Sequence, residues 1–283
     1  MVRRRISEEP VTWLAVYARR FALFALAVSA LDVVIMRANL LEIIPALATL
    51  AGAMMFAFVG ILLALAALVV IWREGVDGLG YALTAIAIGL GLIAYPGYLG
   101  AKAYRLPAIN DITTDPADPP RFEVLARIRP REGANPIAYP GAAFAEKQRA
   151  AYPDIEPVSL DASPQAVYEA AYRIITRRKW QVVEARPPVA RSRDGHIEAV
   201  ARTPIMGFRD DVAVRIRADS EGTRLDVRSA SRYGPHDLGT NAARVSALVD
   251  DIENALDTET PAKPVRPDKP AKPDKPAQPR AKR

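Results

Sequence analysis

Hydrophobic and polar residues are arranged in two different ways along the chain, and the arrangement changes near Tyr104. Before Tyr104, the apolar residues form long runs, each close to the roughly 20 residues that an α-helix needs to cross a bilayer. These runs lie at about 17–36, 43–72 and 79–100. The first run includes Arg19 and Arg20, whose side chains we expect to reach the membrane interface. The pattern predicts a membrane domain, residues 1–104, with three transmembrane helices.

After residue 160 the hydrophobic period switches between that of a helix and that of a strand. Ser163 and Pro164 are typical of an N-cap and a first helical residue, and a helical apolar stripe follows them: Val167, Ala171, Ile174 and Ile175. Strands are expected at 180–186, 196–203, 212–217 and 224–228. A last helix, starting near Asp237 or Thr240, would bury Val245, Leu248, Val249, Ile252 and Leu256. The order α-β-β-β-β-α predicts a two-layer α+β domain, residues 161–258, with an antiparallel sheet and both helices on one face.

The last two expected strands form a hairpin around the polar turn at 219–222. Each strand alternates apolar and charged residues, so one face of the hairpin is apolar and the other is charged. A turn at this position sets Arg215 opposite Asp226 and Val214 opposite Val227. A shift by one residue would move every side chain to the other face.

Two proline-rich stretches flank this domain. Residues 105–160 contain nine prolines together with scattered aromatic residues, which predicts an extended segment that wraps the domain. Within it, residues 110–116 favour a turn over a cation-binding loop. In residues 259–283 a proline recurs at every third position among lysines and arginines, which predicts a disordered basic tail of polyproline type. Such a tail would be an inert spacer or would contact anionic envelope polymers or lipids.

The formal net charge of +6 suggests a nucleic-acid ligand until the charge is located along the chain. Residues 261–283 contain eight Lys and Arg and two Asp, and so account for all of it. The rest of the chain is neutral, so we expect no nucleic-acid partner. The chain has no cysteine, which excludes a disulfide framework, thiolate metal sites and a cysteine nucleophile.

Basic residues near the ends of the apolar runs predict the orientation in the membrane. One side has six, Arg3, Arg4, Arg5, Arg19, Arg20 and Arg73, and the other has three, Arg37, Lys102 and Arg105. The positive-inside rule then places the amino terminus in the cytoplasm. After three crossings the carboxy-terminal domain lies on the far side, which in a Gram-negative bacterium is the periplasm.

Asp32 is an acid within the first apolar run, and an ionisable residue at such a position is by default a functional candidate. Asp32 lies close to the end of the run, which favours a simpler interpretation. We expect Asp32 to lie near Arg37, within a helical turn of the outer interface of the same membrane, and to be solvated there.

The most polar stretch of the domain follows the hairpin and is too varied for a linker. Six of its residues are candidate ligand-binding residues: Ser229, Ser231, Arg232, Asp237, Asn241 and Arg244. The spacing of Asp237, Asn241 and Arg244 puts them on one helix face, so we expect one inward-facing network in which Asp237 and backbone carbonyls accept from Arg244. This network would either fix the loop after the hairpin or present donors to an anionic ligand.

Catalytic groups are harder to assemble from this sequence. A serine nucleophile would need His196 or His236 as its base, and His236 is adjacent to Asp237, where the acid rarely orients the ring. Asp210 and Asp211 are consecutive on a strand and should face opposite ways. Two histidines without cysteine make a poor zinc site, so no metal and no cofactor is expected.

Several of these segments resemble a known family. They are residues 110–115, Tyr152-Pro153, Trp180, Asp210-Asp211, and the run from Asp226 through Arg232 to Asp237, Asn241 and Arg244. They are similar to the domain-of-unknown-function family fourteen ninety-nine of proteobacteria and plastid-bearing organisms, over about residues 106–256. The resemblance implies no activity, substrate or catalytic residue, because the family has none established.

These features predict a multi-pass protein of the bacterial inner membrane whose periplasmic domain interacts with envelope proteins or binds a lipid or a small anionic ligand. The order of elements is similar to a helix-grip arrangement, which can enclose an apolar ligand. The alternative is a hydrolytic or metal-dependent enzyme that uses Asp, Arg and Ser residues of the domain. A cavity with apolar walls and a few fixed polar groups favours binding, whereas an acid with a strongly shifted pKa in a cleft favours an enzyme. The oligomeric state stays open.

Overall fold

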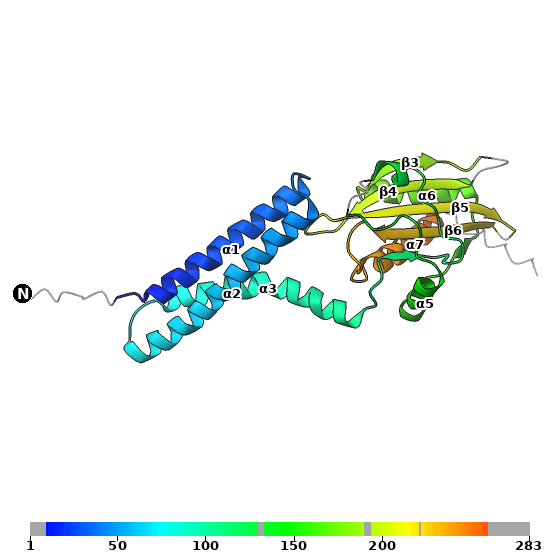
Figure 1. The fold of residues 1–283 in the computed structure, drawn as a ribbon. Helices are drawn as coiled ribbons and strands as arrows, with labels where there is room; N and C mark the ends of the chain where they lie inside the picture. The colour runs from blue at the N-terminus through cyan, green and yellow to red at the C-terminus, as the bar shows by residue number, and fades with distance from the viewer. Residues whose placement is uncertain (1–9, 130–132, 190–193, 221, 260–283) are drawn as a thin grey trace, which may run out of the picture.

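The structure is a computed structural model that describes residues 10–129, 133–189, 194–220 and 222–259. Figure 1 shows three long helices and, beyond one end of them, a sheet with further helices. The basic tail expected at the carboxy terminus lies outside the described residues, except for Glu259. Arg3, Arg4 and Arg5, which enter the orientation argument, also lie outside them.

The three long helices are α1 (Trp13–Arg37), α2 (Ile43–Glu74) and α3 (Leu79–Arg105). They pack against one another through small side chains: Ala15, Ala18, Ala22, Ala64, Ala67, Ala82 and Ala85. Large apolar side chains point outward instead, and Phe24, Met55 and Leu90 are 52%, 67% and 56% exposed. Small residues inside and large apolar residues outside are typical of helices that pack in lipid.

Two of the three expected membrane spans are supported by length and composition. α2 and α3 are long and apolar enough to cross a membrane, whereas α1 is not among the helices that meet this criterion. α1 contains Arg19, Arg20 and Asp32, which interrupt its apolar sequence. The crossing by α1 therefore stays a prediction.

Asp32 is buried in the structure, which corrects the expectation that it is solvated. It lies on the face of α1 that also buries Ala25, Ser29 and Met36, and it is 2% exposed. Neither carboxylate oxygen has a hydrogen-bond partner among the residues that the structure describes, and the same is true of the Ser29 hydroxyl. Close packing of small side chains on this face excludes the water that the sequence-based expectation assumed.

The second part of the molecule is built on a six-stranded antiparallel sheet. Its strands are β1 (Asp111–Thr113), β2 (Val158–Leu160), β3 (Gln181–Arg186), β4 (Gly195–Arg202), β5 (Arg209–Asp219) and β6 (Gly222–Ser231). The order across the sheet is β1-β6-β5-β4-β3, and β2 also pairs with β6. The four expected strands are β3 to β6, with Arg215 opposite Asp226 as predicted. β1 and β2 are additional, and three residues are too few to show an alternating pattern.

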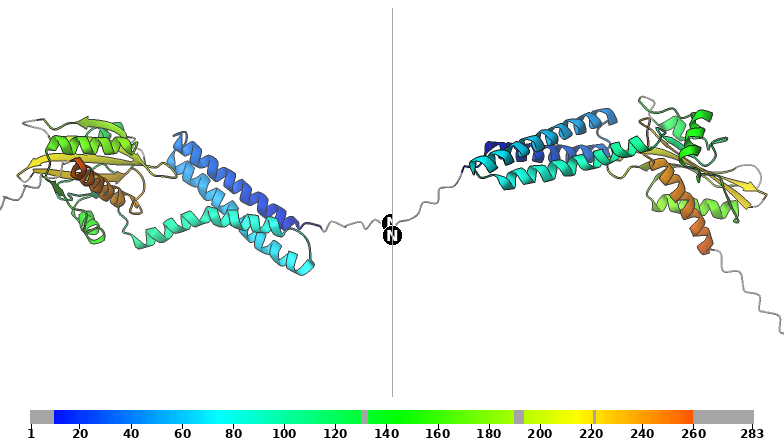
Figure 2. Two further views of the ribbon diagram at one scale, coloured as in Figure 1. Left: turned by 180° about the vertical axis from the view of Figure 1, so that it is seen from behind. Right: turned by 90° about the horizontal axis from the view of Figure 1, so that it is seen from below.

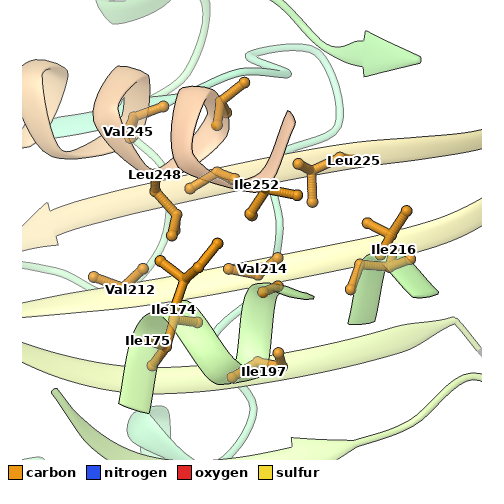
Figure 3. Packing of buried hydrophobic residues seen from close by; sticks show 14 of the residues in the cluster. Ile174, Ile175, Ile197, Val212, Val214, Ile216, Leu225, Val245, Leu248 and Ile252 are labelled. Atoms are coloured by element: carbon orange, nitrogen blue, oxygen red, sulfur yellow. The ribbon is translucent and has the colours of Figure 1, made fainter. Parts of the chain in front are cut away.

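Helices α6 (Pro164–Arg177) and α7 (Thr240–Glu259) cover one face of the sheet, as expected. The Ser163 hydroxyl accepts from the Ala166 N–H and caps α6. Figure 3 shows how the helices meet the strands, with Ile174, Ile175, Val245, Leu248 and Ile252 against Val212, Val214, Ile216 and Leu225. Fully buried side chains fill this space, so the interior is a packed core and differs from a ligand-enclosing helix-grip arrangement.

The segment between α3 and α6 covers the opposite face of the sheet, through Phe122 and Leu125 packed on Val200, Ala213 and Ala230. We call it the wrapping segment, and it contains regular structure: β1, β2, α4 (Leu125–Ile128) and α5 (Ala142–Ala151). The Gln148 side chain of α5 accepts a hydrogen bond from the N–H of Thr113 and donates one to its carbonyl. It therefore pairs the backbone groups at the free edge of β1.

Residues 110–116 show why the turn interpretation was only partly right. Asp115 forms a turn by accepting from the N–H groups of Ala117 and Asp118, as expected for an aspartate before proline. The residues just before it form strand β1, because pairing with β6 supplies their backbone hydrogen bonds. This pairing joins residues more than a hundred positions apart, which local patterns do not reveal.

The hairpin turn requires glycine at position 222. Gly222 has φ +139°, a conformation that other residues rarely adopt. A Cβ atom there would lie 2.3 Å from the Leu160 carbonyl oxygen of β2. The second constraint arises because β2 passes directly beside the turn.

The sheet end that carries the β4–β5 loop contacts the long helices at the corner between α1 and α2 (Figure 2). Arg37 donates to the Pro204 carbonyl at 2.5 Å, and Arg202 donates to the Arg37 carbonyl at 3.2 Å. Met36 and Met206 are buried together in the same place. The α+β part is thus held at the end of the α1–α2 pair.

A second contact joins the end of α3 to the loop before α7. The ring Nε2 of His236 lies 3.2 Å from the carbonyl oxygens of both Ala103 and Leu106, and its Nδ1 accepts from the Leu238 N–H. His236 therefore bonds to backbone groups on both sides, which fixes the loop to the helix.

Candidate functional site

Polar side chains of β5, β6 and α7 meet on the helix-covered face of the sheet. Arg244 donates to Asp210 at 2.6 Å, to the Ser229 hydroxyl at 2.8 Å and to the Asn241 amide oxygen at 2.5 Å. The Ser229 hydroxyl donates to the same Asn241 oxygen at 2.8 Å. We call these four residues the Arg244 network. Its members are buried, and the Arg244 side chain is only 9% exposed.

The network agrees in part with the interpretation of the sequence. Four of the six predicted residues meet here: Ser229, Ser231, Asn241 and Arg244. Ser231 takes part by accepting from the Asn241 amide at 3.0 Å. The acceptor for Arg244 is Asp210, however, and the expectation that Asp237 fills this role is wrong. Asp210 pairs in register with Ser231, and so faces α7 from the neighbouring strand.

The other two predicted residues lie elsewhere, which corrects the expectation of a single network. Asp237 accepts from the N–H groups of Gly239 and Asn241 at 2.9 and 2.8 Å, and so caps α7. Arg232 lies on the opposite face of the sheet and pairs with Asp211 at 2.7 Å. The hydrogen bonds described here are all internal, and a ligand-binding role for the six residues stays a prediction.

The groups considered for catalysis are engaged in other contacts. The Ser229 hydroxyl bonds to Asn241 and Arg244, and His236 bonds to backbone groups. Asp210 and Asp211 face opposite sides of the sheet, as expected for consecutive strand residues. Within the described ranges, no group of three or more His, Asp and Glu side chains is placed to hold a metal ion.

The opposite face of the sheet carries buried ion pairs that the sequence analysis did not identify. Asp211 is fully buried, with Arg129 at 2.9 Å on one carboxylate oxygen and Arg232 at 2.7 Å on the other. Asp111 pairs with Arg228 at 2.6 Å, and both side chains are at most 5% exposed. An ion removed from water needs such close partners, because burying it alone costs several kcal/mol.

The third buried acid on this face, Asp226, has three guanidinium partners. Arg215, Arg217 and Arg224 lie 2.9, 2.9 and 3.0 Å from its carboxylate. The same arginines also reach Asp115 and Asp118 of the wrapping segment, at 2.6 Å for Arg224 to Asp115. Three arginines and three aspartates thus form a neutral cluster that joins the hairpin to this segment. The local pair Arg215–Asp226 was predicted, whereas the partners from the wrapping segment were not.

Glu198 of β4 joins the sheet to the start of α4. Its carboxylate accepts from the N–H groups of residues 123–125, with the shortest contact 2.5 Å to Glu123, and it lies 3.0 Å from the His196 ring. Burial alone would raise the pKa of Glu198, but the hydrogen bonds from His196 and the backbone outweigh burial and lower it. Glu198 is therefore a buried anion held by fixed donors.

A cavity of about 600 Å³ opens beside this charged layer, under the wrapping segment. Its walls are mainly apolar and aromatic, and its polar side chains are Asp118, Arg121 and Arg228. Tyr139 lines it as well, and burial, followed by the nearby Asp111 charge, raises the pKa of Tyr139 to about 12. A cavity with apolar walls and a few fixed polar groups is suited to binding a small ligand. In the sequence, only the aromatic residues of the proline-rich segment pointed to such a cavity.

Comparison with known proteins gives one result. The model of the family described as "Protein of unknown function (DUF1499)" matches residues 111–252, which is half of the chain and spans β1 to α7. This match confirms the resemblance noted in the sequence. No curated protein matches the chain.

Replacement of Arg244 by Met should destabilise the protein by about 3–5 kcal/mol, because it leaves the buried Asp210 carboxylate without its partner. Urea unfolding of the purified chain, followed by circular dichroism, measures the change. The double variant Asp210→Asn/Arg244→Met removes both charges and should recover most of the loss. If the single variant kept full stability, the network would not be structural, and a role in ligand binding would become the better explanation.

Replacement of Glu198 by Gln should destabilise the protein near neutral pH and much less in acid. Because folding lowers the pKa of Glu198, its charge stabilises the fold above the ordinary value of 4.5, and this contribution is lost as the pH falls through the lowered value. The difference in unfolding free energy between the native chain and the variant, measured from pH 7 to pH 3, should therefore shrink. A constant difference would show that the charge of Glu198 does not matter.

Proposed function

The chain belongs to the DUF1499 family of proteins of unknown function, and we propose that it is a membrane-anchored protein of the cell envelope that binds a lipid or another small anionic ligand. In this proposal the three long helices form the anchor. The α+β part, held at one end of them, is the binding module.

The observation that carries this proposal is the state of the candidate catalytic acids. Asp210, Asp211 and Asp226 are all buried, and each has at least one arginine within 3.0 Å. A carboxylate held in this way is a poor general base, nucleophile or metal ligand, because those roles need a free lone pair that can reach a substrate. A hydrolytic or metal-dependent enzyme is therefore the weaker alternative.

A guanidinium group, by contrast, is available beside apolar surface. The cavity under the wrapping segment places the exposed Arg121 next to aromatic walls, where Arg228 is already paired with Asp111. Arginine suits carboxylate and phosphate groups, and apolar walls suit the rest of an amphiphilic ligand. This combination supports binding of an anionic amphiphile.

Exposed apolar side chains on all three long helices support the membrane anchor. Leu31 and Val34 of α1 are 58% and 62% exposed, similar to Val69 of α2 at 55% and Leu90 of α3 at 56%. A surface of this kind is stable in lipid and unfavourable in water. We therefore include α1 as a third span. With three spans, the count of basic residues near their ends favours a periplasmic domain at the bacterial inner membrane. The basic tail is proposed to contact anionic envelope polymers or lipids.

The proposed orientation predicts which reporter is active at the carboxy terminus. Alkaline phosphatase fused after Leu256 should be active, because it folds only outside the cytoplasm. A fluorescent protein that matures only in the cytoplasm should stay dark at the same position. The reverse pair of results would overturn the periplasmic location of the domain.

The proposed ligand class predicts what is carried along when the full chain is purified. After extraction in a mild detergent, mass spectrometry of the washed protein should find a lipid or a small anion bound at a fixed ratio. A parallel preparation of an unrelated three-span protein gives the background. Recovery of no ligand above this background would contradict the binding function.

A further inference from the structure

Three arginines lie side by side across the sheet end that faces the long helices. Arg202 of β4 is directly opposite Arg209 of β5, and the next strand brings Arg232 beside Arg209, where the Arg232 N–H donates to the Arg209 carbonyl. Residues opposite one another in neighbouring strands have their side chains on the same face. Like charges in this arrangement repel each other, so an anion beside the row would stabilise it.

Only one arginine of this row has an anion beside it. Arg232 pairs with Asp211, whereas no described carboxylate lies within salt-bridge distance of Arg202 or Arg209. Arg202 donates to the Arg37 carbonyl, and Arg209 donates to the Asn39 side-chain oxygen. A guanidinium has five N–H donors, so these contacts leave both groups with donors to spare.

Arg209 is also in an unfavourable electrostatic environment. Burial, and after it repulsion from Arg202 and Arg232, lowers the pKa of Arg209 below its ordinary value. An anion placed against Arg209 would relieve that repulsion. Arg37, at the end of α1, adds a third guanidinium without a described carboxylate partner.

A cavity of about 530 Å³ adjoins Arg209, between the sheet end and the corner of α1 and α2. Its apolar lining comes mostly from the corner: Met36, Leu41, Ile43, Ile44, Leu47 and Phe208. Arg209 and Glu42 are the charged residues of the lining. Arg202, opposite Arg209 in the sheet, and Arg37, which lies against Gly207 of the lining, add two guanidiniums beside it, so the described charges here are net positive. The cavity therefore offers positive charge at one side and apolar surface at the other.

The position of this cavity fits the chemistry of its lining. It lies where α1 ends and α2 begins, and the corner residues Leu40 and Ile44 are 77% and 74% exposed. In the proposed anchor this corner is the membrane interface, where lipid phosphates meet acyl chains. A soluble anion would use the arginines and leave the apolar lining bare, whereas a phospholipid would use both.

We propose that this cavity binds one anionic phospholipid, with its phosphate against Arg202 and Arg209 and the first part of an acyl chain against Leu47 and Phe208. The inference rests on the proposed membrane anchor and gives the proposed ligand class a defined site. The lipid would neutralise the arginine row and would fasten the α+β part to the bilayer surface.

The test compares lipid retention by the full chain and its variants. Each protein is purified in detergent with equal amounts of phosphatidylglycerol and phosphatidylcholine, washed, and analysed by native mass spectrometry. The native chain should keep phosphatidylglycerol in preference to phosphatidylcholine. The variant Arg202→Gln/Arg209→Gln should retain at most about one tenth as much phosphatidylglycerol as the native chain, because each lost charge-assisted hydrogen bond weakens binding. Lys147→Gln/Arg149→Gln, which removes two charges from exposed positions on α5, should retain as much as the native chain.

A second variant protects the test against misfolding of the first. Leu47 is 45% exposed and lines the cavity, so Leu47→Trp fills the apolar side while all arginines stay in place. It should also reduce phosphatidylglycerol retention. Unchanged retention in both Leu47→Trp and the arginine variant would overturn the site. Inorganic phosphate that displaced the lipid completely at equal concentration would also overturn it, in favour of a site for a soluble anion.

The result also separates this inference from the proposed function. If the native chain retained phosphatidylglycerol and neither variant changed this, the binding function would stand and the proposed lipid site at Arg209 would fail. If the native chain retained neither lipid nor phosphate, both would fail together.

Discussion

Burial of charge on one face of the sheet is the constraint that organises the α+β part of this protein. Glu198, Asp211 and Asp226 all lie on that face and are fully buried. An isolated ion in such a place would cost several kcal/mol, so each acid must be covered and paired. The wrapping segment does both, since it supplies Arg129 to Asp211 and backbone N–H groups to Glu198. Pairing of this kind specifies one position for this segment on the sheet.

The two faces of the sheet are therefore stabilised in different ways. The face under α6 and α7 is a packed apolar core, and the Arg244 network lies at one part of it. The opposite face combines a small apolar cluster around Phe122 with ion pairs and hydrogen bonds. Since apolar packing is non-directional and charge pairing depends on geometry, the first provides bulk stability and the second fixes the register of the wrapping segment.

The pairing of charged groups also matters where the domain meets the long helices. At the α1–α2 corner, Arg37 and Arg202 exchange contacts with backbone carbonyls, but the guanidiniums of Arg202 and Arg209 have no described carboxylate partner. The wrapping segment neutralises charge elsewhere on the sheet, and in our proposal an external anion does so at this end. The proposed lipid site follows from this difference.

The sequence by itself determined the elements whose information is local. The helix start at Ser163, the strands β3 to β6 and the pair Arg215–Asp226, eleven residues apart, follow from periodicity and turn chemistry. The family resemblance was likewise readable from the motif after the hairpin. Only the tertiary structure decided the partners of Asp211 and Asp111, which are 82 and 117 residues away, and the burial of Asp32. The reason is physical: a repeating pattern shows which face of an element is buried, but the charge that meets it there comes from a distant segment whose approach depends on the whole fold.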